Sequence, residues 1–248
     1  MNKEVRRMWA YAKGCALAVG LLFGLAGAAG AQDSYGKQTF TVCAYNVDGL
    51  PNSIAGIEIN PDGKGEEGAA AIGSYLSEKQ FDVIALSEDF NFHSSLMAPL
   101  AADYTAGTYR GGLNVSGFNA NIRFNTDGLE FLTRTPIVFG SESWTAWKNN
   151  YGKFDNGSDE LITKGFRSYT VSVGDGLLVD FYIVHMDAGS TDADNAARAT
   201  QWEQLRDAIL ARNSGHPVIV MGDTNSRYTR DDIAGLFVAP LSDAYDVS

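Results

Sequence analysis

The sequence HPVIVMGDTN at residues 216–225 decides the fold of this chain. Its apolar run VIVM follows a turn, which predicts a buried strand that Gly222 ends. Asp223 and Asn225 come next, and in an extended backbone their spacing places both side chains on one face. A carboxylate beside a carboxamide at the end of a buried strand is costly to desolvate unless it meets a metal, a phosphate or a proton carrier. The stretch is therefore a candidate functional site.

Three further apolar runs end in the same way. Residues 40–46 end on Asn46, residues 81–88 end on Glu88, and the run that starts at residue 177 reaches His185. Carboxylate, amide and imidazole groups are all able to bind a metal ion or a phosphate. Strands that each deliver such a group at the carboxyl end predict one shared site.

The start of the chain is expected to be a secretory signal peptide over residues 1–31. It is basic at first, residues 16–28 are apolar and small, and residues 29–31 (AGA) have the small-x-small form of a cleavage site near Ala31. The apolar stretch is short and glycine-rich for a membrane span, so an uncleaved anchor is the alternative. The protein is therefore expected to be secreted or periplasmic, with one domain over residues 32–248.

The charge and the cysteines narrow the class of protein. The 248 residues carry 19 Lys and Arg against 30 Asp and Glu, a net charge of −11, and removing the basic signal makes the rest more acidic still. A long basic groove is not evident, so nucleic acid is a less favoured partner. Cys15 leaves with the signal, and Cys43 is expected to be a buried thiol without a disulfide partner. A secreted chain without disulfides fits a bacterial periplasm or surface.

Two strand-helix-strand passages and several hairpins predict a layered α/β sandwich. The first helix is expected over residues 68–79. The second is expected over residues 196–213, capped by Asp192 or Asp194, and it precedes the strand that contains Asp223. The remaining predicted elements are a short helix or turn at 95–101, a hairpin of residues 166–173 and 177–184, and antiparallel strands at 122–124, 129–133 and 137–139.

The motifs, taken in order, resemble the endonuclease/exonuclease/phosphatase superfamily, the fold shared by DNase I-like nucleases, inositol polyphosphate phosphatases and neutral sphingomyelinases. They span about residues 39–243. The resemblance implies a four-layer α/β sandwich with helices outside and sheets inside. The motifs are YNV at 45–47, DVIALSE at 82–88, DGLEFLTRTPI at 127–137, VHMDAG at 184–189 and GDTN at 222–225, with Ser87 where the family usually has glutamine.

One segment favours the lipid phosphodiesterase branch of this superfamily. Residues 159–165 (DELITKG) resemble the aspartate-x4-lysine-glycine segment of neutral sphingomyelinases, which makes Asp159 and Lys164 candidate site residues. The alternative is a surface charge pair of little energetic value.

The family ends with an Asp-His pair whose histidine acts as general base. The histidines of this chain are His93, His185 and His216, and none follows Asn225. Residues 241–246 resemble the segment that precedes the family's last strands. The domain is therefore expected to be C-terminally truncated, without its final strands and the base, which leaves one sheet edge open.

The resemblance implies metal-assisted hydrolysis of a phosphodiester. Glu88 would hold a divalent metal, with Mg²⁺ expected, and Asn46 would share the ligation or touch the phosphate. Asp223 and Asn225 would orient the attacking water and the phosphate. His185 would donate to a non-bridging oxygen as charge builds at phosphorus. Asp187 is a weaker candidate member of the site.

The expected protein is a monomeric, sphingomyelinase-type enzyme that releases phosphocholine and makes peripheral membrane contact. One alternative is a DNase I-like endonuclease, favoured if a basic strip emerges around Arg110, Arg123, Arg134 and Arg167. Another is a catalytically inactive binding protein of the same fold.

Several candidate residues also have structural interpretations. His185 could be a hydrogen-bonded core histidine, Glu88 could pair with Arg110, Arg123 or Arg134, and Asn46 could be a turn former. Asp187 could cap a turn, while His93 is expected at the surface and His216 in a turn before its strand. The aromatic group Trp144, Trp147, Tyr151 and Phe154 is expected either to meet a membrane interface or a choline head group, or to cover a sheet edge.

Overall fold

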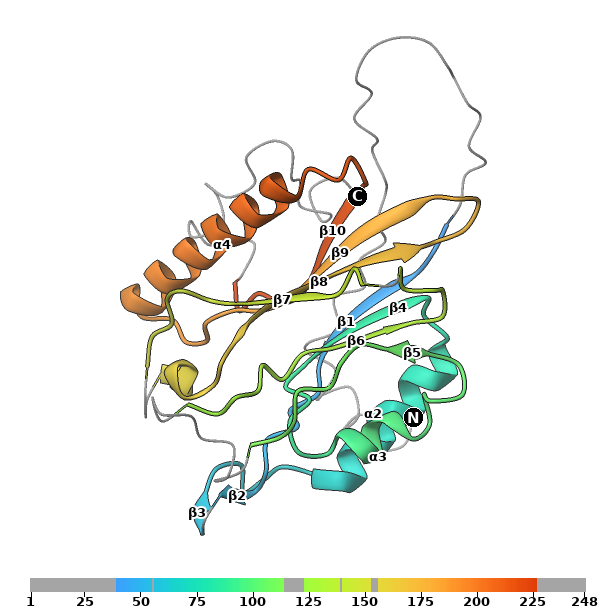
Figure 1. Ribbon diagram of the computed structural model, residues 1–248. Coiled ribbons are helices and arrows are strands. Elements are labelled where there is room, and N and C mark those ends of the chain that lie inside the picture. The colour runs from blue at the N-terminus through green and yellow to red at the C-terminus, as the bar shows by residue number, and fades with distance from the viewer. Residues whose placement is uncertain (1–38, 55, 114–122, 139, 153–155, 227–248) are drawn as a thin grey trace, which may run out of the picture.

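The computed structural model describes residues 39–54, 56–113, 123–138, 140–152 and 156–226. Figure 1 labels the elements. The helices are α2 (Gly65–Lys79), α3 (His93–Met97), the 3₁₀ helix Asn156–Leu161 and α4 (Asp192–Arg212). The strands are β1 (Val42–Asn46), β2 (Ser53–Ile54), β3 (Ile57–Glu58), β4 (Val83–Ser87), β5 (Thr105–Ala106), β6 (Glu130–Thr133), β7 (Ser143–Ala146), β8 (Gly165–Ser172), β9 (Leu178–His185) and β10 (Val218–Asp223).

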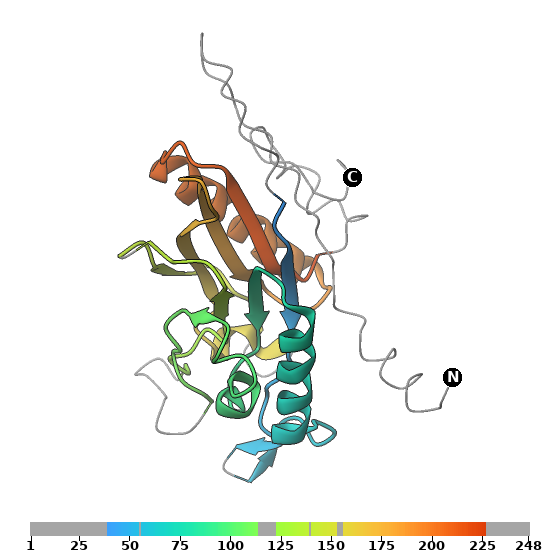
Figure 2. The ribbon, with the colours of Figure 1, turned by 90° about the vertical axis from the view of Figure 1, so that its right-hand side faces the viewer.

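Two four-stranded sheets pack face to face between helices. One sheet has the order β1-β4-β6-β5 and the other has the order β10-β9-β8-β7. Helices α2 and α3 lie on the outer side of the first sheet, and α4 lies on the outer side of the second (Figure 1). The turned view in Figure 2 shows β1 and β10, from different sheets, next to each other. This is the four-layer α/β sandwich that the motifs implied, and the fold prediction is confirmed.

Both predicted strand-helix-strand passages are present, and each brings two strands into parallel register. Helix α2 connects β1 to β4, and α4 connects β9 to β10. Helix α4 begins with a capping box in which the Thr191 hydroxyl and the Asp194 carboxylate each accept a hydrogen bond from the other residue's backbone N–H. The predicted cap at Asp192 or Asp194 is therefore wrong, because Thr191 is the cap and Asp194 is its partner in the first turn.

Three layers of apolar side chains hold the sandwich together. The first fills the space between the sheets, the second lies under α2 and α3, and the third lies under α4. The layer between the sheets includes Val83, Ala85 and Phe131 of the first sheet and Tyr169, Val171, Phe181 and Ile183 of the second. Cys43 is a buried thiol in β1, as predicted.

Other sequence predictions were incomplete. Of the three predicted antiparallel strands, residues 130–133 form one, whereas in the described parts of the other two Phe124 and Ile137 make isolated bridges. Residues 122 and 139 of those predictions lie outside the described ranges. The polar region after β1 contains a small hairpin, β2–β3, that the sequence did not indicate. Residues 143–146 form edge strand β7, which pairs with β8 and which the sequence did not indicate.

The predicted signal peptide and the predicted truncation after the last motif both involve residues outside the described ranges, and they stay predictions. Within the described ranges, no helix combines the length and the apolar character that a bilayer span requires.

The layer between the sheets should dominate stability. Phe131 is fully buried and stacks on Tyr169 with 4.2 Å between ring centroids. We expect Phe131→Ala to lower the free energy of unfolding by about 3–5 kcal/mol, because it leaves a cavity between two sheets. Leu210→Ala on α4, where the side chain is 52% exposed, should change it by about 0.5 kcal/mol or less. Urea unfolding followed by circular dichroism measures both, and equal losses would contradict this account of the core.

Candidate functional site

The polar groups at the ends of four strands meet at one end of the sandwich, which is called the mouth below. In the first sheet Asn46 is in register with Ser87, the residue before Glu88, and in the second sheet Asp223 is in register with His185. The Asn46 amide nitrogen donates to Glu88 Oε1 at 2.8 Å and to Asp223 Oδ2 at 2.9 Å. His185 Nε2 lies 3.8 Å from Glu88 Oε1. The structure therefore brings together four of the predicted site residues.

The backbone at Glu88 has a strained conformation. Its φ of 62° lies in the left-handed region, which non-glycine residues seldom adopt. The Glu88 carbonyl accepts hydrogen bonds from the backbone N–H groups of Gly49 and Phe90. A Cβ on Gly49 would lie 2.4 Å from that carbonyl oxygen, so glycine is required for this close approach. The turn directs a partly exposed carboxylate into the mouth.

Burial raises the pKa of Glu88, the hydrogen bond from Asn46 opposes this, and the carboxylates of Asp48 and Asp223 raise the pKa further. Burial also works against the charge of Asp223, but the hydrogen bonds from Asn46 and the Asn225 backbone and the charge of Lys164 favour the carboxylate, and the pKa of Asp223 is lowered. Two carboxylates that share one amide form a site that a cation would stabilise.

His185 is a buried, neutral imidazole. Its side chain is 2% exposed, and Nδ1 has no hydrogen-bond partner among the described residues. Burial and then the charge of Lys164 lower its pKa to about 3, against the effect of Asp223. At neutral pH the ring therefore carries one N–H, which suits a hydrogen-bond donor to a phosphoryl oxygen. The interpretation as a satisfied core histidine does not fit an unpartnered ring nitrogen.

Asn225 reaches the site by a route that differs from the one predicted. Strand β10 ends at Asp223, and Asn225 has a φ of 50°, so the chain turns where an extended backbone was assumed. The Asn225 backbone N–H donates to Asp223 Oδ1 at 2.9 Å, and its amide donates to the Met186 carbonyl at 3.0 Å. The turn thus holds Asp223 and the segment after β9 together.

Lys164 and Asp159 form a buried ion pair, so the alternative of a surface charge pair is wrong. Lys164 Nζ also donates to the Met186 carbonyl at 3.3 Å, and Asp159 accepts from the Ala188 backbone N–H at 2.9 Å. Burial raises the pKa of Asp159, with Lys164 opposing. The pair shapes the backbone that follows His185, and its predicted catalytic part stays a prediction.

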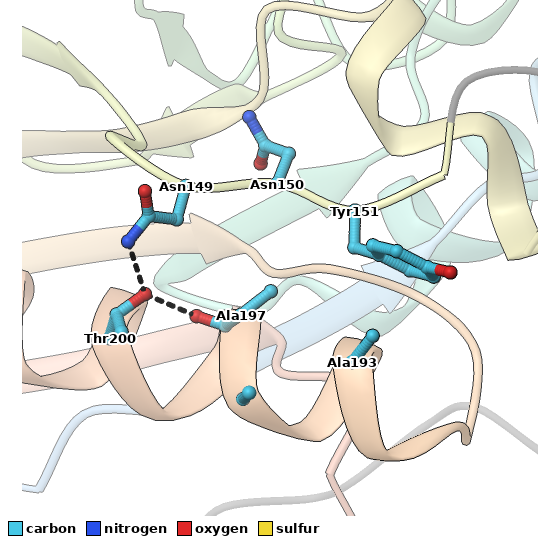
Figure 3. A pocket seen from close by; sticks show the side chains of 7 residues that line it. Asn149, Asn150, Tyr151, Ala193, Ala197 and Thr200 are labelled. Atoms are coloured by element: carbon cyan, nitrogen blue, oxygen red, sulfur yellow. Dashed lines mark hydrogen bonds between the residues drawn. The ribbon is translucent and has the colours of Figure 1, made fainter.

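Asp187 is fully buried beside this pair. Its Oδ2 accepts from the Tyr151 backbone N–H at 2.7 Å, and its own N–H donates to Gln201 Oε1 at 2.9 Å. Burial, and then the nearby Asp159, raise the pKa of Asp187 to about 7. A pocket of about 320 Å³ lies between α4 and the loop after β7, and Figure 3 shows its lining side chains. Its lining residues are Asn149, Asn150, Tyr151, Ala193, Ala196, Ala197 and Thr200.

The aromatic group divides between core and surface. Trp147 is buried under α4, and its indole N–H donates to the His185 carbonyl at 2.8 Å, so it covers the sheet and also fixes the end of β9. The Arg110 guanidinium stacks on the Trp144 ring, with 3.9 Å between the Arg110 Cζ atom and the ring centroid. Tyr151 is 39% exposed, and Phe154 lies outside the described residues.

Three of the four arginines considered for a basic strip have partners within the protein. Arg167 is fully buried and makes two hydrogen bonds to Asp127. Arg110 lies 3.7 Å from the same carboxylate, and Arg134 donates to the Gln80 carbonyl. The contacts of Arg110 and Arg134 are therefore made to groups other than Glu88, with which the sequence analysis considered an ion pair.

Sequence reasoning missed three features of this region. Asp89 and Glu130 are buried carboxylates beside His93, which is partly buried where a surface position was expected. Arg167 with Asp127 is a buried ion pair. A charge inside the apolar run LEFL of residues 129–132 was the available signal for Glu130. His216 precedes β10, as expected, and contacts Asp180.

The chain matches the model of the Endonuclease/Exonuclease/phosphatase family over residues 43–243. It belongs to this family. A sphingomyelinase of Mycobacterium bovis is 25% identical over 213 residues, which are 84% of this chain and 38% of the relative. The chain thus spans well under half the length of that curated relative.

Two solved structures of other proteins share the fold. Sphingomyelinase C from Streptomyces griseocarneus superposes with a TM-score of 0.63 at 21% identity, covering 80% of this chain and 68% of that one. A double mutant of beta toxin from Staphylococcus aureus with bound magnesium ions gives 0.62 at 18% identity, covering 79% and 68%.

The donor set of this family member suits a hard divalent cation. Glu88 and Asp223 present carboxylate oxygens and Asn46 carries an amide oxygen, which are the ligand types that a hard divalent cation prefers. The Asn46 amide oxygen accepts from the Asp48 backbone N–H at 3.0 Å, as in the turn former considered from the sequence.

The histidines should titrate far apart. His185 should stay neutral from pH 8 to pH 5, because its pKa is about 3. The free energy of unfolding should decrease as the pH falls from 6.5 toward 3, because over this range the unfolded state binds a proton that the folded state does not. Burial alone would lower the pKa of His93, but Asp89 outweighs it and raises the pKa above 6.5. Two-dimensional ¹⁵N NMR of the imidazoles measures both. A His185 signal that titrates near pH 6.5 would contradict the geometry described for this ring.

Proposed function

We propose that this family member is a secreted, Mg²⁺-dependent phosphodiesterase of the sphingomyelinase type, which releases phosphocholine from a phospholipid. The observation that carries the proposal is that the Asn46 amide donates to both Glu88 and Asp223, while His185 Nε2 lies 3.8 Å from Glu88 Oε1. Two carboxylates and a neutral imidazole at one mouth combine a cation site with a hydrogen-bond donor. That combination fits hydrolysis of a phosphodiester.

Glu88 would hold the metal ion with Asn46. When bound, the ion supplies Lewis-acid polarisation of a phosphoryl oxygen and stabilises a leaving alkoxide. Asp223 keeps its charge because its pKa is lowered, so it is able to orient a water molecule by accepting a hydrogen bond.

His185 and Asn225 would act on the phosphate. The neutral His185 ring donates through Nε2 to a non-bridging oxygen, and its position is fixed because Trp147 holds its carbonyl. Asn225 lies beside Asp223 through its backbone hydrogen bond, where its amide group would orient the phosphate. Lys164 donates to the carbonyl of Met186, the residue after His185, and its ion pair with Asp159 holds the Lys164 side chain in place.

Lipid is the favoured substrate class for three reasons. The relatives that carry the resemblance are named sphingomyelinases. Asp159, Lys164 and Gly165 follow the spacing that resembles neutral sphingomyelinases. The β2–β3 hairpin, which projects beyond the body of the molecule in Figures 1 and 2, exposes Ile57 by 68%, and Ile59 just after it is 43% exposed. This hairpin would make the peripheral membrane contact.

Nucleic acid is the less favoured substrate. The net charge of −11 works against binding a polyanion. Arg167 and Arg110 contact the Asp127 carboxylate, and Arg134 donates to the Gln80 carbonyl. An inactive binding protein remains the candidate from another class, which the activity assay addresses.

The full-length protein should release phosphocholine from sphingomyelin vesicles in Mg²⁺ and should lose this activity in EDTA. The reason is that the carboxylates at the mouth need a divalent cation to approach a phosphate. A choline-coupled assay measures release, and plasmid DNA serves as the comparison substrate. Cleavage of DNA without release from lipid would reject the lipid assignment, and activity on neither substrate would favour a binding protein.

Glu88→Gln should weaken Mg²⁺ binding by at least about tenfold, because the substitution removes a charged ligand and keeps the shape of the side chain. Glu78→Gln, on α2 with a side chain 75% exposed, is the matched control and should leave the affinity unchanged. Isothermal titration calorimetry gives both affinities. An unchanged Mg²⁺ affinity in Glu88→Gln would remove Glu88 from the metal site.

A further inference from the structure

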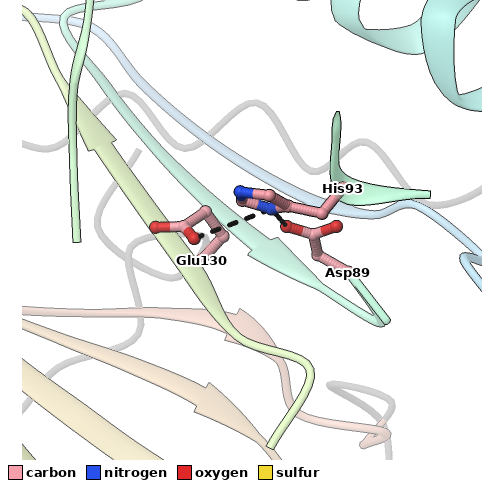
Figure 4. A group of neighbouring side chains, drawn as sticks. All are labelled: Asp89, His93 and Glu130. Atoms are coloured by element: carbon pink, nitrogen blue, oxygen red, sulfur yellow. Dashed lines mark hydrogen bonds and ion pairs between the residues drawn. The ribbon is translucent and has the colours of Figure 1, made fainter. Parts of the chain in front are cut away.

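A second group of metal-competent side chains lies directly after Glu88. Asp89 follows it, His93 is the first residue of α3, and Glu130 is the first residue of β6 (Figure 4). His93 Nδ1 lies 2.6 Å from Asp89 Oδ2 and 4.0 Å from Glu130 Oε2, and the three potential ligand atoms lie within 4.8 Å of one another. This group has its own partners, separate from the Asn46 and His185 side chains that contact Glu88.

One carboxylate oxygen of this group lacks a donor. Glu130 is fully buried, and its Oε1 accepts from the Phe131 backbone N–H at 3.0 Å, but Oε2 has no hydrogen-bond partner among the described residues. Figure 4 shows this oxygen directed toward the imidazole. A buried carboxylate oxygen without a partner is costly. The unpartnered oxygen points to a ligand that supplies positive charge.

The nearby protein cation is already engaged. Arg167, which is fully buried, makes a two-point contact with Asp127 at 2.6 and 2.8 Å. Asp89 is 2% exposed, so water is also largely excluded from its carboxylate. His93 is the exception, since its side chain is 22% exposed and gives access from solvent.

We propose that Asp89 Oδ2, His93 Nδ1 and Glu130 Oε2 bind one divalent transition-metal ion of the Zn²⁺ class. One imidazole nitrogen with two carboxylate oxygens favours such an ion over the all-oxygen sites of Mg²⁺ and Ca²⁺. Bonds of about 2.0–2.2 Å in a tetrahedral site separate neighbouring ligand atoms by roughly 3.3 Å. The observed separations of 2.6 and 4.0 Å lie on either side of that value, so small side-chain rotations suffice.

The surroundings fix the orientation of the histidine. Tyr109 stacks on the His93 ring with 3.8 Å between centroids and 12° between planes, and its hydroxyl donates to the Phe90 carbonyl. Asp89 is held by its own backbone hydrogen bond to the Gly128 carbonyl at 2.9 Å. Such supporting contacts hold ligands in position around metal ions.

The ion would have a structural role that bears on the main site. It joins the end of β4, the start of α3 and the start of β6, and Asp89 is covalently next to the left-handed Glu88. An ion at this position therefore fixes the turn that directs Glu88 into the mouth. The ion is distinct from the Mg²⁺ expected at Glu88, and this inference does not depend on the identity of the substrate.

The test is calorimetric titration of Zn²⁺ alone into the full chain already saturated with Mg²⁺. We expect one equivalent to bind, with a rise in melting temperature. His93→Gln and Glu130→Gln should each weaken Zn²⁺ binding by at least about tenfold. The matched control is His216→Gln, because His216 also contacts a carboxylate, Asp180 at 3.2 Å, with a side chain 30% exposed. This variant should bind Zn²⁺ as the parent does.

Three outcomes would overturn the inference. They are no Zn²⁺ binding by the parent protein, unchanged binding by His93→Gln, and loss of binding in Glu88→Gln with retention in His93→Gln. Titration with Co²⁺ gives a second readout, since visible absorption from a bound ion should disappear in His93→Gln. Circular dichroism confirms that each variant is folded. If the buried Glu130→Gln does not fold, the partly exposed His93→Gln still decides the question.

Discussion

The contact on which the site depends is the double hydrogen bond from the Asn46 amide to Glu88 and Asp223. Asn46 ends β1 in one sheet and Asp223 ends β10 in the other, so one carboxamide joins the two sheets at the mouth. The apolar layer between the sheets sets the distance that this amide spans. Packing energy is thereby used to hold two carboxylates close together, which an isolated pair of like charges would oppose.

Behind these side chains, a layer of polar contacts fixes the backbone after β9. Lys164 and Asp159 form a buried ion pair that also bonds to Met186 and Ala188, and Trp147 holds the His185 carbonyl. A buried ion pair contributes little net stability, because its desolvation cost offsets the attraction. Its value here is positional, since it holds the segment between His185 and the start of α4. The imidazole is thus presented neutral and in one orientation.

Glu88 lies between two arrangements of polar groups. Its carboxylate contacts Asn46 and His185. The next residue, Asp89, contacts His93, which in turn lies near Glu130. The left-handed backbone at Glu88 is maintained because Gly49 approaches its carbonyl closely on one flank, while Asp89 is bonded to Gly128 on the other. A strained residue persists where its neighbours over-determine it. Both candidate ion sites share this turn.

The sequence by itself determined the layers and which strands carry polar groups to the same end of the sandwich. Apolar runs that each end on a polar group predict strands whose carboxyl ends meet, and Asn46, Glu88, His185 and Asp223 do meet. Only the tertiary structure decided the rest. Thr191 caps α4, Asn225 reaches the site through a turn, and Lys164 with Asp159 is buried. The local spacing of apolar residues predicts whether a segment is a helix or a strand. It does not predict the partner of a buried charge, because that partner comes from a segment distant in the sequence. For this reason the meeting of Asp89, His93 and Glu130 was visible only after folding.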